Sequence, residues 1–122
     1  MKIGKELTKG SNELMVLSVL SKTPMYGYEI IKTIEQSSEN VFQMKEGTLY
    51  PILHSLESGG YLESYWIEVD GRKRKYYKIT NKGLKQFEDN TAEWTAFSTA
   101  IQNVLSWQSL PAEPQILLQK LE

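Results

Sequence analysis

The sequence contains no cysteine, one histidine and two arginines among its 122 residues. Without cysteine there is no disulfide framework and no thiolate metal site, and a reducing interior is the natural home of such a chain. The single histidine, His54, has no sequence partners for catalysis or metal binding, and no glycine loop suited to cradling phosphate is present. We therefore expect no enzyme, no cofactor and no metal ion.

Long apolar runs are also missing. No stretch approaches the roughly 20 apolar residues that a membrane helix needs, and the start, "MKIGKELTKG", lacks the apolar run of a signal peptide. The hydrophobic content of 40%, with 11% aromatic, suffices for a modest core. Burial is limited in so short a chain, so oligomerisation would add stability. We expect one soluble, cytoplasmic domain with an appended element and no membrane contact.

Two apolar helices are predicted in the first third of the chain. Residues 11–21 begin with a Ser/Asn cap candidate and run into a dense apolar stretch that Pro24 ends. In "MYGYEIIKTIEQSSE", residues with 3.6-residue periodicity share one face. These are Gly27, Ile30, Ile31 and Ile34.

A third helix is predicted in "EGTLYPILHSLESGG". Its inward stripe repeats at i, i+3, i+4 and i+7 and comprises Leu49, Ile52, Leu53 and Leu56. Thr48 as the N-cap would put Pro51 third in the helix, where its missing N–H costs nothing. Gly59 and Gly60 are a plausible stop.

Two strand-like runs follow, "YLESYWIEV" and "KRKYYKIT". Between them lies Asp70-Gly71, a strong signal for a tight β-hairpin. Trp66, placed near the end of the first strand, is expected to pack, as is Trp107 farther along the chain.

The longest predicted helix covers residues 80–107, with Thr80 as its N-cap. Spacings of 3 and 4 form a heptad seam through Leu84, Phe87, Thr91, Trp94, Ser98, Ile101 and Leu105, flanked by Phe97 and Val104. At ~1.5 Å per residue this helix would be about 40 Å long, too long to bury against so small a domain. We expect it to pair with a second copy through Leu84, Phe87, Thr91, Phe97, Ile101, Val104 and Leu105.

The order helix, helix, helix, hairpin, long helix predicts a mainly α protein with a small β-hairpin. It is the plan of a winged helix-turn-helix with a long C-terminal dimerisation helix, and in such proteins the last helix of the trio enters the major groove of DNA. The predicted boundaries are 1–79 for the winged helix, 80–107 for the dimerisation helix and 108–122 for a tail with a short helix.

Positive charge is concentrated between residues 72 and 82. The segment has six basic residues and no acid, whereas the other positions carry 8 basic and 15 acidic residues. Most of this run lies on the second strand of the hairpin, where Lys and Arg are suited to DNA phosphates. The predicted contacts are Arg72, Lys73, Arg74 and Lys75. The alternative is an ordinary solvated charge run.

The polar face of the third helix supplies further candidates for DNA binding. With the leucines inward, Gly47, Tyr50, Pro51 and His54 face outward. Tyr50 and His54 are one turn apart, and both can donate hydrogen bonds to phosphates or base edges. The alternatives are core packing for Tyr50 and simple solvent exposure for His54. Lesser candidates are Lys45, Thr48 and Tyr26.

Three separated stretches, "MYGYEIIKTIEQ", "KEGTLYPILHSLESGGYLES" and "GRKRKYYKIT" followed by "KG", resemble the signatures of the PadR family of bacterial transcriptional regulators. The resemblance covers roughly residues 10–105. It implies a homodimeric winged helix-turn-helix repressor whose C-terminal helices pair. The two recognition helices would then read successive major grooves of an inverted repeat in double-stranded DNA.

A closer likeness is to the lactococcal multidrug-binding member of that family, through "SYW", the basic hairpin and "EWTAFSTAIQNVL". It implies that Trp94 stacks on a planar aromatic effector at the dimer interface, with Leu14 and Met15 nearby. The chain departs from that member at Ser98, which replaces an acidic group, so a preference for cations is not implied. Trp94 as a mere interface anchor is the alternative.

Two other functions stay open on the sequence. One is a winged-helix module that binds protein instead of DNA, and the other is a DNA-binding regulator without a small-molecule effector.

Overall fold

The computed structural model describes residues 3–4, 8 and 10–107, so the short helix predicted within 108–122 lies outside the described residues. The chain divides into two compact units, residues 1–91 and residues 92–122. We describe each unit by itself.

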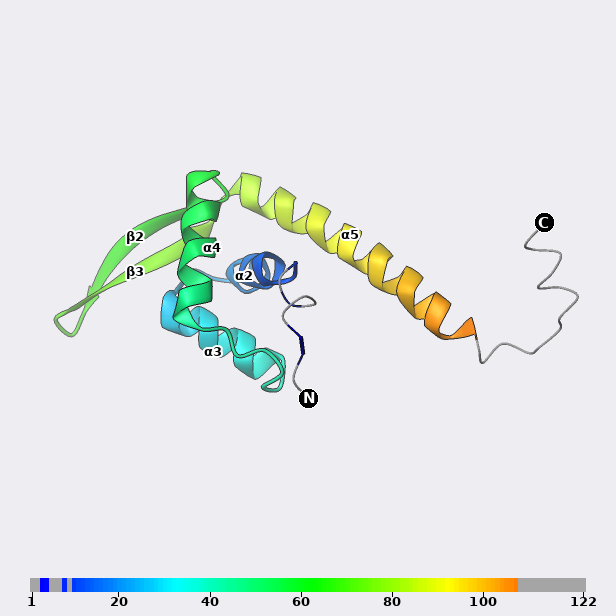
Figure 1. Cartoon of the computed structure of the whole chain (residues 1–122). Helices are drawn as coiled ribbons and strands as arrows, with labels where there is room; N and C mark the ends of the chain where they lie inside the picture. The colour runs from blue at the N-terminus through cyan, green and yellow to red at the C-terminus, as the bar shows by residue number, and fades with distance from the viewer. Residues whose placement is uncertain (1–2, 5–7, 9, 108–122) are drawn as a thin grey trace, which may run out of the picture. The chain divides into compact units, whose positions relative to one another are not determined.

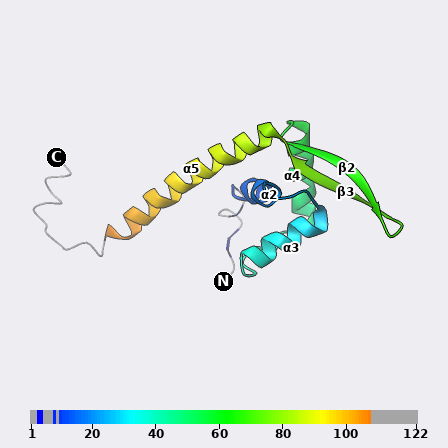
Figure 2. The same cartoon turned by 180° about the vertical axis from the view of Figure 1, so that it is seen from behind.

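The elements follow the predicted order, with one addition. They are α2 (Asn12–Leu20), β1 (Met25–Tyr26), α3 (Gly27–Ser37), α4 (Glu46–Ser58), β2 (Leu62–Val69), β3 (Arg72–Ile79) and α5 (Asn81–Leu105). In Figures 1 and 2 the helices α2, α3 and α4 gather together, and the hairpin β2–β3 extends beyond them to its loop. This arrangement confirms a winged helix fold with a long C-terminal helix.

One hydrophobic core joins the three helices to the base of the sheet. Each helix contributes side chains with almost no exposure, such as Leu17 from α2, Ile30 from α3 and Leu53 from α4. The sheet closes the core with Leu62 and Tyr77. Because the buried residues of α4 repeat every three or four positions, its opposite face stays in solvent.

The hairpin has the tight loop that Asp70-Gly71 predicts. The antiparallel register runs from Leu62 opposite Ile79 to Val69 opposite Arg72, which leaves only two residues in the loop. Asp70 and Gly71 have φ angles of 52° and 76°. Two successive residues with positive φ are typical of a type I′ turn, which matches the right-handed twist of the flanking strands.

A third strand was not predicted. The sequence places Met25 and Tyr26 in the second helix, but they form the two-residue strand β1, which pairs antiparallel with β3. The strand order is β1-β3-β2. Helix α3 therefore starts at Gly27, and the Glu29 carboxylate accepts the backbone N–H of Tyr26 at 3.3 Å.

Helix α4 begins earlier than the sequence indicates. It starts at Glu46 with Lys45 as the N-cap, so Thr48 is within the helix. Pro51 therefore lies beyond the first turn, where the ring leaves the carbonyl of Gly47 without the usual N–H donor. The end is as predicted: Gly59 is the C-cap, and Gly60 follows with a φ of 79°.

The first turn of α5 is fixed to the turn between α4 and β2. The Thr80 hydroxyl accepts the N–H of Gly83 at 3.0 Å, which confirms Thr80 as the N-cap, and it donates to the carbonyl of Gly60 at 2.7 Å. The Lys82 ammonium donates to the carbonyl of Gly59 at 2.7 Å. Gly83 itself is buried and packs closely on the backbone of Tyr61. A Cβ at this position would lie 2.1 Å from the carbonyl oxygen of Tyr61.

None of the helices among the described residues is long and apolar enough to cross a membrane.

Candidate nucleic-acid interface

A hollow of about 490 Å³ lies where α4, the hairpin and the start of α3 meet. It brings together six of the residues predicted to bind DNA: Tyr26, Tyr50, His54, Lys73, Arg74 and Lys75. Gly27, Trp66 and Tyr77 complete its lining. A concave surface that combines ammonium, guanidinium, phenol and imidazole groups is suited to a polyanion.

The remaining predicted residues do not line the hollow but are exposed around it. Lys45, Gly47, Thr48 and Pro51 are exposed in the first half of α4 and at its N-cap, and Arg72 is exposed at the start of β3. Nothing lies within 4 Å of the position that a Cβ would take at Gly47. The first half of α4 therefore leaves room for close approach by another molecule.

Arg74 is held in place by Tyr26. Its guanidinium donates to the Tyr26 hydroxyl at 2.9 Å and lies over the same ring, 4.5 Å from the centroid. The Tyr26 ring in turn contacts Tyr76 at a centroid distance of 5.5 Å, and Tyr76 stacks on Tyr65 at 6.0 Å. A guanidinium has five N–H donors, so this arrangement orients Arg74 and still leaves donors for a ligand.

Lys75 has an acidic neighbour. Its ammonium lies 3.7 Å from the carboxylate of Glu57 on α4, and Ser64 donates a hydrogen bond to that same carboxylate. Burial raises the pKa of the adjacent Tyr77 phenol, an effect that the Lys75 charge opposes. The phenol is therefore neutral near pH 7. Lys75 ties the hairpin to α4, and its charge is partly neutralised.

Arg72 and Lys73 differ from the two basic residues that follow them. Both are exposed, and no ion pair engages either one within the part of the chain that the structure describes. They are the side chains of the basic run that are available for phosphates at the loop end of β3.

Tyr50 is packed on one side and exposed on the other, so the structure leaves both core packing and DNA contact open for it. A Cβ on Gly27 would lie 2.6 Å from the Tyr50 hydroxyl, so the phenol packs closely on the start of α3. Its side chain is nevertheless 39% exposed. His54, one turn later, is exposed on the same side of α4 and lines the hollow.

Trp66 is a site residue that the sequence did not reveal. It lies in the middle of β2, 65% exposed, directly opposite Lys75 in the register. The expectation that it packs is wrong. Trp66 shares one face of the hairpin with Ser64 and Glu68, two positions away on either side, and with Lys73 and Lys75 on the paired strand. These polar neighbours on the same face could have indicated an exposed position.

The four predicted effector residues belong to different units. Leu14 and Met15 are half-buried on α2, whereas Trp94 is 49% exposed on the later part of α5. Ser98 donates to the carbonyl of Thr95 at 3.2 Å. Across the described ranges, no group of three metal-ligating side chains is present.

A helical trio with a basic hairpin beside its last helix defines a winged helix-turn-helix protein. The sequence profile described as "Transcriptional regulator PadR-like family" matches residues 16–89 of this chain, more than half of its length. The chain therefore belongs to the PadR-like family of transcriptional regulators.

Individual relatives agree with this assignment. Transcriptional regulator Rv3488 of Mycobacterium tuberculosis is 30% identical over 105 residues, which cover 86% of this chain and 92% of that protein. A transcriptional regulator from Clostridium thermocellum superposes with a TM-score of 0.76 at 33% identity, covering 81% and 97% of the two chains. A PadR family regulator from Eggerthella lenta gives 0.74 at 32% identity, covering 84% and 88%. The family and these relatives are regulators of transcription, not enzymes.

Proposed function

We propose that this chain is a homodimeric repressor that binds an inverted-repeat operator in double-stranded DNA. The observation that carries the proposal is the basic hollow between α4 and the hairpin, which unites residues from three separated sequence stretches. Outside residues 72–82 the chain has an excess of acidic residues. A local cationic surface on an otherwise negative body would orient the protein on DNA as well as attract it.

Each part of the surface has a distinct role in this proposal. The exposed face of α4, with Thr48, Tyr50 and His54, enters the major groove and meets base edges. The loop end of the hairpin, with Arg72 and Lys73, neutralises phosphates on the adjacent backbone. Arg74, held by Tyr26, forms a fixed donor between these two regions.

Dimerisation would occur through the second part of α5. Between Trp94 and Leu105 the large apolar side chains are exposed in the single chain, with Phe97 at 63%. Large apolar side chains repeated along one helix are typical of an interface with another helix. Pairing two copies would also pair two α4 helices, as a two-fold symmetric operator requires.

The test is the salt dependence of binding to the DNA upstream of the coding region. The double variant Arg72→Gln/Lys73→Gln should lower the slope of log K against log salt by about 2, because each lost phosphate contact removes about one released counterion. Lys85→Gln, an exposed lysine on α5, is the matched control and should keep the full slope. An unchanged slope in the double variant would reject the phosphate role. A complete lack of binding would favour a protein-binding module.

The effector hypothesis concerns Trp94. Its exposed indole lies in the same apolar series as Phe97 and Ile101, which supports stacking on a planar aromatic compound that releases the DNA. Such a compound must bind the DNA-incompetent state more tightly. Titration should quench fluorescence in the wild type but not in Trp94→Phe, a comparison needed because Trp66 and Trp107 also emit. Equal quenching in both would reject this site, and no quenching would favour a regulator without that effector.

A further inference from the structure

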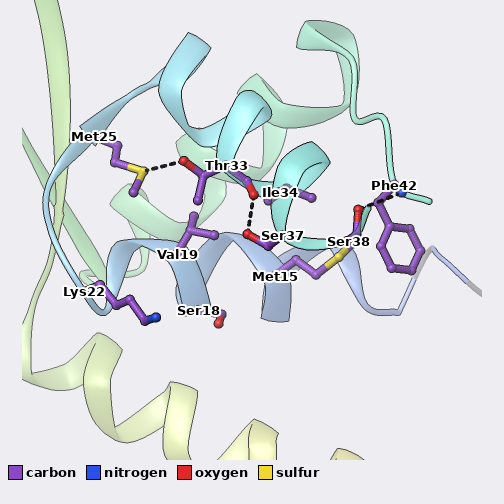
Figure 3. A pocket seen from close by; sticks show the side chains of 10 residues that line it. All are labelled: Met15, Ser18, Val19, Lys22, Met25, Thr33, Ile34, Ser37, Ser38 and Phe42. Carbon is purple, nitrogen blue, oxygen red and sulfur yellow. Dashed lines mark hydrogen bonds between the residues drawn. The ribbon is translucent and has the colours of Figure 1, made fainter. Parts of the chain in front are cut away.

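A second pocket, of about 320 Å³, lies between α2 and α3, next to Met25 of β1 (Figure 3). Its walls are mostly apolar and come from α2, β1, α3 and the segment after α3. Met15, Val19, Met25, Ile34 and Phe42 supply these walls. This volume is at the lower end of the range for small-molecule sites, and a mainly apolar lining with few polar groups is typical of them.

The apolar walls are formed mainly by aliphatic and thioether side chains rather than by flat aromatic rings. Two of the five side chains are methionines, which adapt to irregular shapes, and Phe42 is the only aromatic ring among them. No pair of rings is available to enclose a planar ligand from both sides. The lining therefore favours an aliphatic chain over a flat aromatic compound.

The rim of the pocket carries one positive charge. Lys22, in the turn after α2, lines the pocket together with the Ser18 hydroxyl, one helical turn earlier. No ion pair or hydrogen bond to the Lys22 ammonium is present among residues 3–4, 8 and 10–107. The other serines of the rim have local partners: Ser37 donates to the carbonyl of Thr33, and Ser38 accepts the N–H of Phe42.

We propose that this pocket binds a medium-chain aliphatic carboxylate. The carboxylate would bind the Lys22 ammonium and the Ser18 hydroxyl at the rim, and the chain would lie among Met15, Val19 and Met25. A charged head beside an unpaired ammonium and an apolar chain against flexible apolar walls match the two parts of the lining.

Strand β1 connects this pocket to the DNA-binding hollow. Its two residues point in opposite directions, as neighbours in a strand do. Met25 lines the pocket, and Tyr26 lines the hollow and holds Arg74. Met25 is partly buried against the hydrophobic core, and its sulfur accepts a hydrogen bond from the Thr33 hydroxyl at 3.6 Å, which is weak because a thioether is a poor acceptor. A chain that displaces the Met25 side chain would shift β1 and reorient Arg74, which lowers DNA affinity; this last consequence rests on the proposed function.

Binding can be tested without DNA. The methyl groups of the methionines, labelled with ¹³C, report binding by NMR. Octanoate should shift the methyl signals of Met15 and Met25. The signal of Met44, which is in the core and does not line the pocket, should not shift. Lys22→Gln should weaken octanoate about threefold, within the range for one exposed charge pair. Lys85→Gln should leave the octanoate affinity unchanged. 1-Octanol, which has no carboxylate, should bind Lys22→Gln and the wild type with equal affinity. Absent shifts at Met15 and Met25, or equal octanoate affinity in Lys22→Gln and the wild type, would overturn the proposal.

A second variant, Val19→Phe, is designed to fill the pocket with a larger side chain. Val19→Phe should abolish the octanoate shifts, and its Met44 signal reports whether the core is intact. On operator DNA, saturating octanoate should lower wild-type affinity but not that of Val19→Phe. Octanoate that binds without changing wild-type DNA affinity would overturn the link through β1. If the protein binds no DNA at all, the repressor function fails, and the methyl shifts still decide the pocket.

Discussion

The two parts of α5 have the same sequence periodicity but different surroundings. In the first part, up to Thr91, Gly83 is buried and Phe87 packs against the core of its own chain. In the second part, Trp94, Phe97 and Ile101 are exposed, as are the apolar residues that follow them. Within the heptad series itself, Phe87 packs against the core although Leu84 is 36% exposed, whereas the large apolar members from Trp94 onward are all exposed.

This difference shows that heptad spacing does not by itself identify an interface. The spacing records only that apolar side chains share one side of a helix. Whether that side meets the same chain or a second copy depends on what the rest of the fold brings to it. Substitutions in the first part should therefore change the folding stability of the chain, and substitutions in the second part should change its assembly.

The largest effect is expected at Gly83. A Cβ there would lie 2.1 Å from the backbone oxygen of Tyr61 and 2.6 Å from Ile79, so Gly83→Ala forces α5 away from the sheet. We expect a loss of about 3 kcal/mol in the free energy of unfolding, measured by urea denaturation. Gly47→Ala is the matched control, because nothing lies within 4 Å of the added Cβ. It should not lower the stability, since alanine is more favourable than glycine in a helix by about 1 kcal/mol. Similar stability changes in the two variants would contradict the anchored first turn.

In the second part of α5, Phe97→Glu should affect assembly instead of folding. A charge at an apolar contact costs about 2 kcal/mol at an interface, so the dissociation constant of the dimer should rise about 30-fold. Analytical ultracentrifugation over a concentration series measures it, and circular dichroism should show an unchanged helix content. A wild type that is monomeric at every concentration would remove the distinction between the two parts.

A smaller effect is expected at the N-cap. Thr80→Ala removes the acceptor for the N–H of Gly83 and the donor to the carbonyl of Gly60. Such caps contribute about 1 kcal/mol, so the thermal midpoint should fall by several degrees. Thr80→Ser keeps the hydroxyl and should stay near the wild type. Equal losses in both variants would mean that the methyl group matters and the cap does not.

The smallest effect is expected at Lys82. Its ammonium binds the carbonyl of Gly59 at the end of α4 and lies 4.6 Å from the centroid of the Tyr61 ring. Lys82→Gln should cost about 0.5 kcal/mol, and 1 M salt should reduce the difference. If the variant instead weakened DNA binding as strongly as Arg72→Gln/Lys73→Gln, Lys82 would belong to the DNA surface and not to the first turn of α5.

Features set by local chemistry were predictable from the sequence. Asp70-Gly71 tolerates two positive φ angles, Thr80 offers a capping hydroxyl, and Gly60 accepts a left-handed conformation after α4. Each depends on a few neighbouring residues, which is why the hairpin and the helix limits nearby could be placed. Concentrated charge likewise predicted which strand would carry the cationic surface.

Features set by distant contacts were not predictable. Strand β1 exists because Met25 and Tyr26 reach β3, about fifty residues later, and two residues are too few to show an alternating pattern. The sequence also could not separate Arg74, held by Tyr26, from its exposed neighbour Lys73. Helix α4 starts at Glu46 behind an N-cap, Lys45, whose side chain makes no capping hydrogen bond, so no local signal marked it.

The two-residue loop limits how the length of the hairpin β2–β3 can change. Because β2 and β3 pair residue by residue up to Val69 and Arg72, one inserted residue would either form a bulge or shift the pairing by one position. In the shifted case, Lys73 and Lys75 would exchange faces with Arg74 and Tyr76. Exposed positions of the hairpin, such as Arg72 and Lys73, can therefore change in charge without altering the register, whereas a one-residue change in strand length cannot.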